Sequence, residues 1–128
     1  MNTPANTHPG EPDVAIWLYL QFLREAHANN VPITLSPDES WLLQEIAIRW
    51  LDNNPMSVHE AINLGHLGSP ATLHKRLSRL RSMKLLAIGQ RETDRRTKYL
   101  VATPQSLNHF KALGIAMQKA VQGQTLTA

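Results

Sequence analysis

The sequence predicts a mainly α-helical fold that carries one small β-hairpin. Three observations lead to this fold class. Segments with apolar residues at helical spacing follow one another, and most of them open with a serine or threonine cap. Only one region, near residues 85–102, has the pattern of two short strands. The length of 128 residues and the hydrophobic content of 42% fit a single domain with one modest core.

The first expected helix runs from Asp13 to about Ala28 and is followed by a short extended connector to Leu35. Its apolar side chains, among them Trp17 and Leu20, surround the helix axis instead of forming one stripe. A helix that is apolar nearly all round needs cover on two sides. In a domain of this size, we expect a second subunit to supply part of that cover.

Two helices in the middle of the chain begin with the same signature. Serine stands three residues before glutamate at 36–39 and again at 57–60, which is the spacing of a capping box. The first box also has proline at a position that suits the first helical turn. We therefore expect one helix to run to about Asp52 and a short helix to cover 58–64.

A tight connection, Gly-His-Leu-Gly at 65–68, leads to a further helix over 69–84 that Ser69 and Pro70 open. Two helices joined by a short turn containing glycine are a helix-turn-helix candidate. One face of this helix is apolar at i, i+4 and i+7, and it should face the core through Leu73, Leu77 and Leu80.

Two strand-like segments follow, 85–90 and 98–102, separated by a polar tip over 91–97 that is rich in arginine. Thr103 and Pro104 then cap a final helix. This order of elements is that of a winged helix-turn-helix domain, in which the hairpin is the wing. The expected organisation is a flexible tail, 1–12, and a single domain, 13–128, with an N-terminal helix and connector, 13–35, a winged-helix core, 36–103, a C-terminal helix, 104–122, and a tail, 123–128.

The apolar residues of the final helix repeat at intervals of 3, 4, 3 and 4. Such a repeat is a seam for another helix, within the chain or across a dimer. We expect the N- and C-terminal helices to form the dimer interface. The residues predicted at that interface are Trp17, Leu20, Leu107, Phe110, Met117 and Val121.

The positive charge is concentrated in one segment. Residues 75–98 contain nine basic and two acidic residues, a formal charge of +7, whereas the rest of the chain has four basic and eight acidic residues, or −4. This concentration is the electrostatic footprint of a polyanion binder. The alternative, a well-solvated helix, normally mixes both signs.

The face of helix 69–84 that lies opposite the leucines is small, hydroxylic and cationic, with Ala71, Lys75 and Ser78 at its centre. An α-helix fits the major groove of DNA, where arginine and lysine donate to guanine O6 and N7. The predicted DNA-binding residues are Ser69, Thr72, Lys75, Arg76, Arg79, Arg91, Arg95, Arg96 and Lys98.

From Thr72 to Thr103 the chain resembles the multiple-antibiotic-resistance regulator (MarR) family of winged-helix transcription factors. The stretch TLHKRLSRLRSMKLL is similar to the family's recognition helix, and DRRTKYLVAT is similar to its wing motif. The resemblance implies a homodimer whose recognition helices enter successive major grooves of a near-palindromic operator. It also implies that Arg96 reaches the minor groove and that Asp94 supports the wing.

The chain departs from the family pattern at three places. Lys84 stands where the family usually has glycine, at a helix end that favours a left-handed residue. Ile88 replaces an arginine that is common at the start of the wing. One long helix, rather than two, follows the wing.

Several function classes find no support in the residues. The absence of cysteine excludes disulfides and thiolate metal sites, and the six histidines are too scattered to indicate a metal site. We see no catalytic constellation, no cofactor motif, no membrane span and no signal peptide, so we expect a cytoplasmic protein that is not an enzyme. The three tryptophans could line an aromatic ligand pocket, but at helical spacing they are interpreted as core: Trp17, Trp41 and Trp50.

The sequence therefore predicts a sequence-specific regulator that binds double-stranded DNA and acts as a repressor. Two alternatives stay open: a winged-helix module that binds an acidic protein, and a DNA-binding factor of plasmid maintenance or replication. The outward face of the basic helix carries no aromatic anchor, which favours a groove over a protein interface. The operator and any small-molecule effector cannot be derived from the residues.

Overall fold

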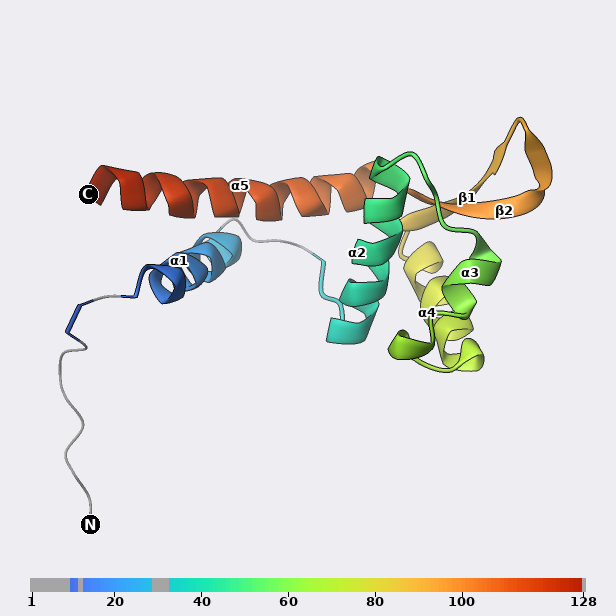
Figure 1. The fold of residues 1–128 in the computed structure, drawn as a ribbon, viewed down its shortest axis with the longest axis horizontal. Coiled ribbons are helices and arrows are strands. Elements are labelled where there is room, and N and C mark those ends of the chain that lie inside the picture. The colour runs from blue at the N-terminus through green and yellow to red at the C-terminus, as the bar shows by residue number, and fades with distance from the viewer. Residues whose placement is uncertain (1–9, 12, 29–32, 128) are drawn as a thin grey trace, which may run out of the picture. The chain divides into compact units, whose positions relative to one another are not determined.

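The computed structural model describes residues 10–11, 13–28 and 33–127, with side chains to residue 123, and it confirms the predicted fold class (Figure 1). The predicted tail, 1–12, lies almost wholly outside the described residues. In chain order the elements are α1 (Val14–Ala28), α2 (Pro37–Leu51), α3 (Val58–Ile62), the short 3-10 helix η1 (Gly65–Leu67), α4 (Pro70–Ser82), β1 (Leu86–Arg91), β2 (Asp94–Ala102) and α5 (Pro104–Thr127).

The chain divides into two compact units. The winged-helix unit comprises Pro32–Phe110, and the terminal unit combines Met1–Val31 with Lys111–Ala128. Helix α5 contributes its first turns to the winged-helix unit and the remainder to the terminal unit. It also continues to Thr127, beyond the predicted end at Gln122.

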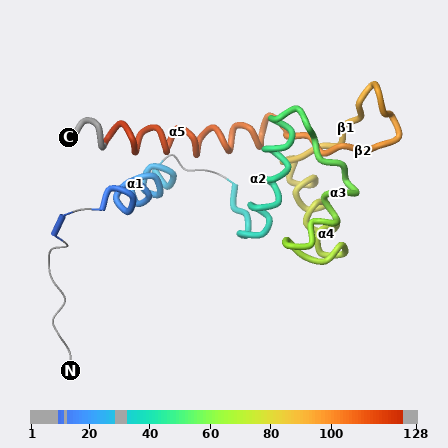
Figure 2. The backbone as a smooth tube through the Cα atoms, viewed as in Figure 1, coloured from blue at the N-terminus to red at the C-terminus, as the bar shows by residue number. Residues whose placement is uncertain are grey.

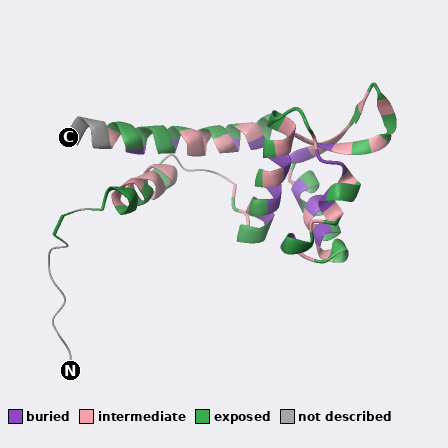
Figure 3. Cartoon of the chain, in the orientation of Figure 1, coloured by how far each residue is buried: buried purple, intermediate pink, exposed green. Residues whose placement is uncertain are grey.

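The core of the winged-helix unit is built mainly from leucine side chains of α2, α4 and the hairpin. The predicted apolar ridge of α4 is confirmed, because Leu73, Leu77 and Leu80 are all buried. Figure 3 shows this burial along the inner sides of the helices of the unit. With its apolar face committed to the core, α4 presents its opposite face to solvent.

Both predicted capping boxes are present. At the start of α2, the Ser36 hydroxyl accepts from the Glu39 N–H at 3.2 Å, and the Glu39 carboxylate accepts from the Ser36 N–H at 3.0 Å. Ser57 and Glu60 make the same pair of bonds at the start of α3, at 3.0 and 3.2 Å. These bonds satisfy backbone N–H groups that a helix start leaves without partners.

The wing is an antiparallel pair of strands in which Leu86 faces Ala102 and Arg91 faces Asp94. The strands continue farther than predicted, so the expected polar tip over 91–97 is wrong in extent. Figure 2 traces the backbone of this hairpin, which projects from the helices of the winged-helix unit. Only Glu92 and Thr93 form the turn, because the segment from Asp94 onward already pairs in β2. The first residues of β2 are charged or carry hydroxyl groups. Their polarity is typical of a loop, so the sequence predicted a loop where an exposed strand forms.

Helix α4 ends with a left-handed residue, although that residue is not glycine. Lys84 has a φ of 61°, and the Leu85 N–H donates to the Leu80 carbonyl at 3.0 Å. The Lys84 carbonyl in turn accepts from the Thr103 hydroxyl at 2.7 Å. The helix therefore ends in the left-handed conformation that usually has glycine, although lysine occupies the position. This conformation costs a residue with a Cβ about 1 kcal/mol or more.

The terminal unit buries much less. None of the residues of α1 is buried, and among the described residues of α5 in this unit, Ala116 and Ala120 are the buried ones. The interpretation of the three tryptophans as core is wrong: Trp41 is exposed, and Trp17 and Trp50 are half-buried. Apolar residues on several faces of α1 and α2 exceed what the cores of these small units can cover.

Candidate nucleic-acid interface

The first turn of α4 is organised by Ser69 and Thr72. The Ser69 hydroxyl accepts from the Thr72 N–H at 3.2 Å and lies 2.9 Å from the Thr72 hydroxyl. Ser69 is exposed and Thr72 is half-buried. The helix start is thus capped from within the chain, and its small side chains leave room for a close approach.

The outward face of α4 is exposed as the leucine ridge requires. Ala71, Lys75, Ser78 and Ser82 are all solvent-exposed. In the part of the chain that the structure describes, Lys75 forms no ion pair. Its ammonium group is therefore available to a phosphate or to a base edge.

Arg76 is turned toward its own protein. One terminal nitrogen donates to the Leu67 carbonyl and the other to the Asp38 carboxylate at 3.2 Å. Gly68 permits this arrangement, because its φ is 144° and a Cβ there would stand 3.2 Å from an Arg76 nitrogen. Arg76 therefore joins the turn before α4 to the start of α2, and its predicted DNA contact stays a prediction.

Arg79 forms an ion pair with Glu39 at the start of α2, through its Nε atom. The Glu39 side chain is buried, whereas 58% of the Arg79 side chain is exposed. The backbone N–H of Ser36, more than the nearby guanidinium, holds the pKa of Glu39 below its ordinary value. The Glu39 carboxylate is therefore ionised at neutral pH, and it contacts both the start of α2, through Ser36, and α4, through Arg79.

The wing is held by Asp94. Its carboxylate accepts from the backbone N–H groups of Arg96 and Thr97, at 3.2 and 3.3 Å, and from the Thr97 hydroxyl. These bonds, the Thr97 hydroxyl first, lower the pKa of Asp94. This geometry supports the expected role of Asp94 in the wing, while Arg95, Arg96 and Lys98 are exposed on β2.

Arg91 is held at the other side of the hairpin. Its guanidinium carbon lies 5.1 Å from the centre of the Tyr99 ring, and it donates to the Asn53 carbonyl at 3.2 Å. A cation over a ring face is attracted by the ring's quadrupole. Arg91 thus connects the wing to the segment after α2.

Sequence reasoning missed the acidic partners of α4. Asp38 and Arg76 are 38 residues apart in the chain, and the glutamate of the first capping box was predicted only as a local cap. The signal that was present is weak: two acidic residues in the first turn of a helix that has to pack near α4. Long-range pairing of this kind is not encoded in a local pattern.

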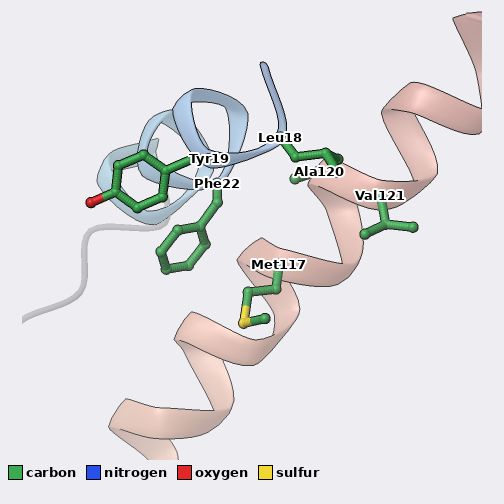
Figure 4. A pocket seen from close by; sticks show the side chains of 6 residues that line it. All are labelled: Leu18, Tyr19, Phe22, Met117, Ala120 and Val121. Carbon is green, nitrogen blue, oxygen red and sulfur yellow. The ribbon is translucent and has the colours of Figure 1, made fainter. Parts of the chain in front are cut away.

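The residues predicted at the dimer interface fall into two groups. Phe110 packs against the core of the winged-helix unit. In the terminal unit, Leu20 and Met117 are exposed. Figure 4 shows the cavity beside Met117, of about 350 Å³, which lies between α1 and α5 and has an almost wholly apolar lining: Leu18, Tyr19, Phe22, Met117, Ala120 and Val121.

The described residues contain neither a metal-binding cluster nor a membrane-spanning helix. No group of three or more histidine, aspartate or glutamate side chains there is arranged to hold a metal ion. Within the same residues, the helices are too short or too polar to cross a membrane.

No profile of a known protein family matches the sequence, and no curated protein matches it. Solved structures do. One of them is S. aureus MepR bound to ethidium bromide, with a TM-score of 0.68 and 13% identity over 90% of this chain and 80% of that one. A MepR variant bound to an oligodeoxyribonucleotide gives 0.62 and 13%, over 92% and 86%. The transcriptional regulator Tm0710 from Thermotoga maritima gives 0.60 and 16%, over 89% and 74%.

The chain has the fold of a MarR-type winged-helix regulator. At these identities the likeness concerns the fold, and function has to be argued from the residues.

Proposed function

We propose that this protein is a transcriptional regulator that binds double-stranded DNA in a sequence-specific way. The observation that carries the proposal is the exposure of Lys75, Arg95, Arg96 and Lys98 on the two elements that a winged helix uses for DNA. In the described residues none of these four cations forms an ion pair. They can therefore displace counterions from phosphates, which is the main source of affinity for DNA.

In this proposal the small face of α4 enters the major groove and the wing lies over the adjacent minor groove. The proposed contacts of α4 are Ser69, Thr72, Lys75, Arg76 and Arg79. Those of the wing are Arg91, Arg95, Arg96 and Lys98, with Asp94 in support. A narrow minor groove concentrates negative potential and attracts arginine, which favours Arg96 for that contact.

The regulator acts as a homodimer on a near-palindromic operator and represses by occupying it. The exposed apolar side chains of the terminal unit, including Leu20 and Met117, support dimer formation, because apolar surface of this kind marks interfaces. A two-fold symmetric dimer presents two recognition helices to successive major grooves. A neighbour with this fold, a MepR mutant, is bound to an oligodeoxyribonucleotide, which supports DNA as the ligand proposed for this chain.

The test is binding to duplex DNA by fluorescence anisotropy, across a salt series, with fragments selected from a random pool and unselected DNA for comparison. Each neutralised phosphate contributes about −0.9 to the slope of log affinity against log salt. We expect a steep slope and a selected fragment bound at least about a thousandfold more tightly than unselected DNA. Equal, weak binding to all fragments would refute the proposal and favour the alternative of an acidic protein partner.

The wing is tested separately with Arg96→Ala. We expect affinity for the selected fragment to fall by about 1–2 kcal/mol, with the fold and the dimer intact, because Arg96 is exposed and makes no side-chain bond in the described structure. The matched control is Arg24→Ala, an exposed arginine on α1 outside the proposed surface. Unchanged affinity in Arg96→Ala would remove the wing from the mechanism.

A further inference from the structure

The recognition helix α4 carries three cations that the proposed function assigns to DNA, and each has a different environment. Lys75 is exposed and forms no ion pair within the described residues. Arg76 uses both of its terminal nitrogens inside the protein. Arg79 is bound through Nε, the inner nitrogen of its guanidinium.

The partner of Arg79 is rigidly placed. One oxygen of the Glu39 carboxylate accepts from the Ser36 N–H at 3.0 Å, and the other forms the ion pair with Arg79 Nε. Glu39 is only 7% exposed, so its rotamer is fixed by packing as well as by these two bonds. An anionic partner at Nε restricts the orientation of the guanidinium, which is planar and carries its five N–H donors in a rigid fork.

The same contact leaves the other end of Arg79 accessible. The side chain is 58% exposed, and among the described residues its two terminal nitrogens have no hydrogen-bond partner. Those nitrogens carry the paired N–H groups that can donate to guanine O6 and N7. A held guanidinium loses less rotamer freedom on binding than a free one, which favours affinity for a base in one geometry.

The charge of the pair favours a base over a phosphate. The Glu39 carboxylate compensates the positive charge of Arg79, so attraction to any passing phosphate is reduced. Hydrogen bonds to the neutral acceptors of a base edge are affected less by this compensation. An arginine of this kind adds to discrimination between sequences more than to binding of DNA in general.

We propose that Glu39 is a positioning residue for sequence reading, which holds Arg79 through Nε so that its terminal nitrogens face a guanine edge in the major groove. This inference rests on the proposed function, since it assumes that α4 enters DNA. In this inference, the DNA-sequence specificity of α4 depends on the ion pair between Arg79 and Glu39 of α2, and not on the number of exposed cations on α4.

The test compares Glu39→Gln with Asp38→Asn. In E39Q the amide oxygen can still accept from the Ser36 N–H, but an NH2 group then faces Arg79 and no longer holds it. In D38N the neighbouring carboxylate loses the same charge, while Arg76 keeps its bond to the Leu67 carbonyl. The two variants therefore match in net charge and in position at the start of α2, but only E39Q removes the anionic partner of Arg79, while Arg76 stays held by the Leu67 carbonyl in D38N.

The measured quantity is the ratio of affinities for the selected fragment and for unselected DNA, at one salt concentration. We expect E39Q to lower this ratio about tenfold, which corresponds to about 1.4 kcal/mol, without weakening the binding of unselected DNA. We expect D38N to leave the ratio unchanged. An unchanged ratio in E39Q, or an equal fall in D38N, would overturn the positioning role.

Two further variants connect the effect to Arg79 and guard against misfolding. In an Arg79→Ala background, E39Q should change the ratio no further, because the residue through which it acts is absent. Arg79→Lys keeps the charge and a bond to Glu39 but lacks the fork, so it should lower the ratio as E39Q does. A normal ratio in Arg79→Lys would also overturn the inference.

Binding by the wild-type chain distinguishes failure of the proposed function from failure of the positioning role alone. A wild-type chain that binds every fragment equally would refute the proposed function and the positioning role together. A wild-type chain with a normal preference that E39Q leaves intact would refute the positioning role alone.

Discussion

The two units of this chain differ in how much of their apolar surface is buried. The winged-helix unit encloses its apolar residues, and the ridge of α4 has Leu73 and Leu80 with no exposed area at all. The terminal unit is also rich in apolar side chains, but none of the residues of α1 is buried, and Leu20 is 55% exposed. One unit therefore buries its apolar side chains within a single copy, whereas the other leaves exposed the apolar surface that we propose for dimer formation.

The difference indicates which unit contributes most to the free energy of folding and which contributes to the free energy of association. Burial of apolar area within one chain contributes to folding, whereas the same area left exposed contributes only when a partner covers it. The stability of a single chain should therefore depend on the winged-helix unit, and the oligomeric state on the terminal unit. Each of the following variants tests one side of this division.

The largest expected effect is the loss of a core leucine. Leu80→Ala should lower the free energy of unfolding by about 2–5 kcal/mol, because it leaves a cavity beneath α4 where the side chain has no exposed area. Leu20→Ala should change it by less than about 0.5 kcal/mol in dilute protein. Urea unfolding followed by circular dichroism measures both. Equal losses would mean that the terminal unit contributes as much to folding as the winged-helix unit.

The next effect concerns association. Leu20→Glu should weaken the proposed dimer at least about a hundredfold, since a charge in the proposed apolar interface would have to lose its hydration. The matched control is Ile48→Glu on α2, which has nearly the same exposure, 53% against 55%, but lies in the winged-helix unit. Sedimentation equilibrium should show a shift toward the monomer for L20E only. A shift for I48E instead would transfer the dimer interface to the winged-helix unit.

Much of the fold could be predicted because its signals are local. Capping boxes at Ser36 and Ser57, the leucine ridge of α4 and the hairpin each depend on residues within one or two turns. The extent of the wing was misjudged because an exposed strand with charged side chains has the composition of a loop. The environment of the α4 arginines could not be predicted, since Glu39 meets Arg79 only after α2 and α4 have packed.

A smaller effect is expected at the end of α4. Lys84 adopts a φ of 61°, in the left-handed region that glycine adopts without steric cost. Lys84→Gly should raise the free energy of unfolding by about 1 kcal/mol, reduced in part by the greater freedom of glycine in the unfolded chain. The bond from the Thr103 hydroxyl to the carbonyl of residue 84 should persist, because it involves only the backbone there. A lower stability would show that the lysine side chain contributes contacts that outweigh the strain.

The smallest effect is a dependence of stability on pH. His109 is buried at the start of α5, its Nδ1 atom has no hydrogen-bond partner among the described residues, and burial lowers its pKa from the ordinary 6.5. Between 6.5 and the lower pKa of the folded state, the unfolded chain binds more protons, so stability should fall as the pH falls through that window. His109→Leu should remove this part of the decline.

The carboxylates give a control within the same titration. The backbone N–H groups of Ser36 and Ser57 lower the pKa values of Glu39 and Glu60 from the ordinary 4.5, so their contribution is complete above that pH and is lost below it. Urea unfolding at intervals from pH 7 to 3.5 should therefore show two separate declines, of which His109→Leu removes only the one at higher pH. If both declines persist in that variant, the loss near neutral pH comes from another group, and the buried imidazole of His109 is protonated as readily in the folded chain as in the unfolded one.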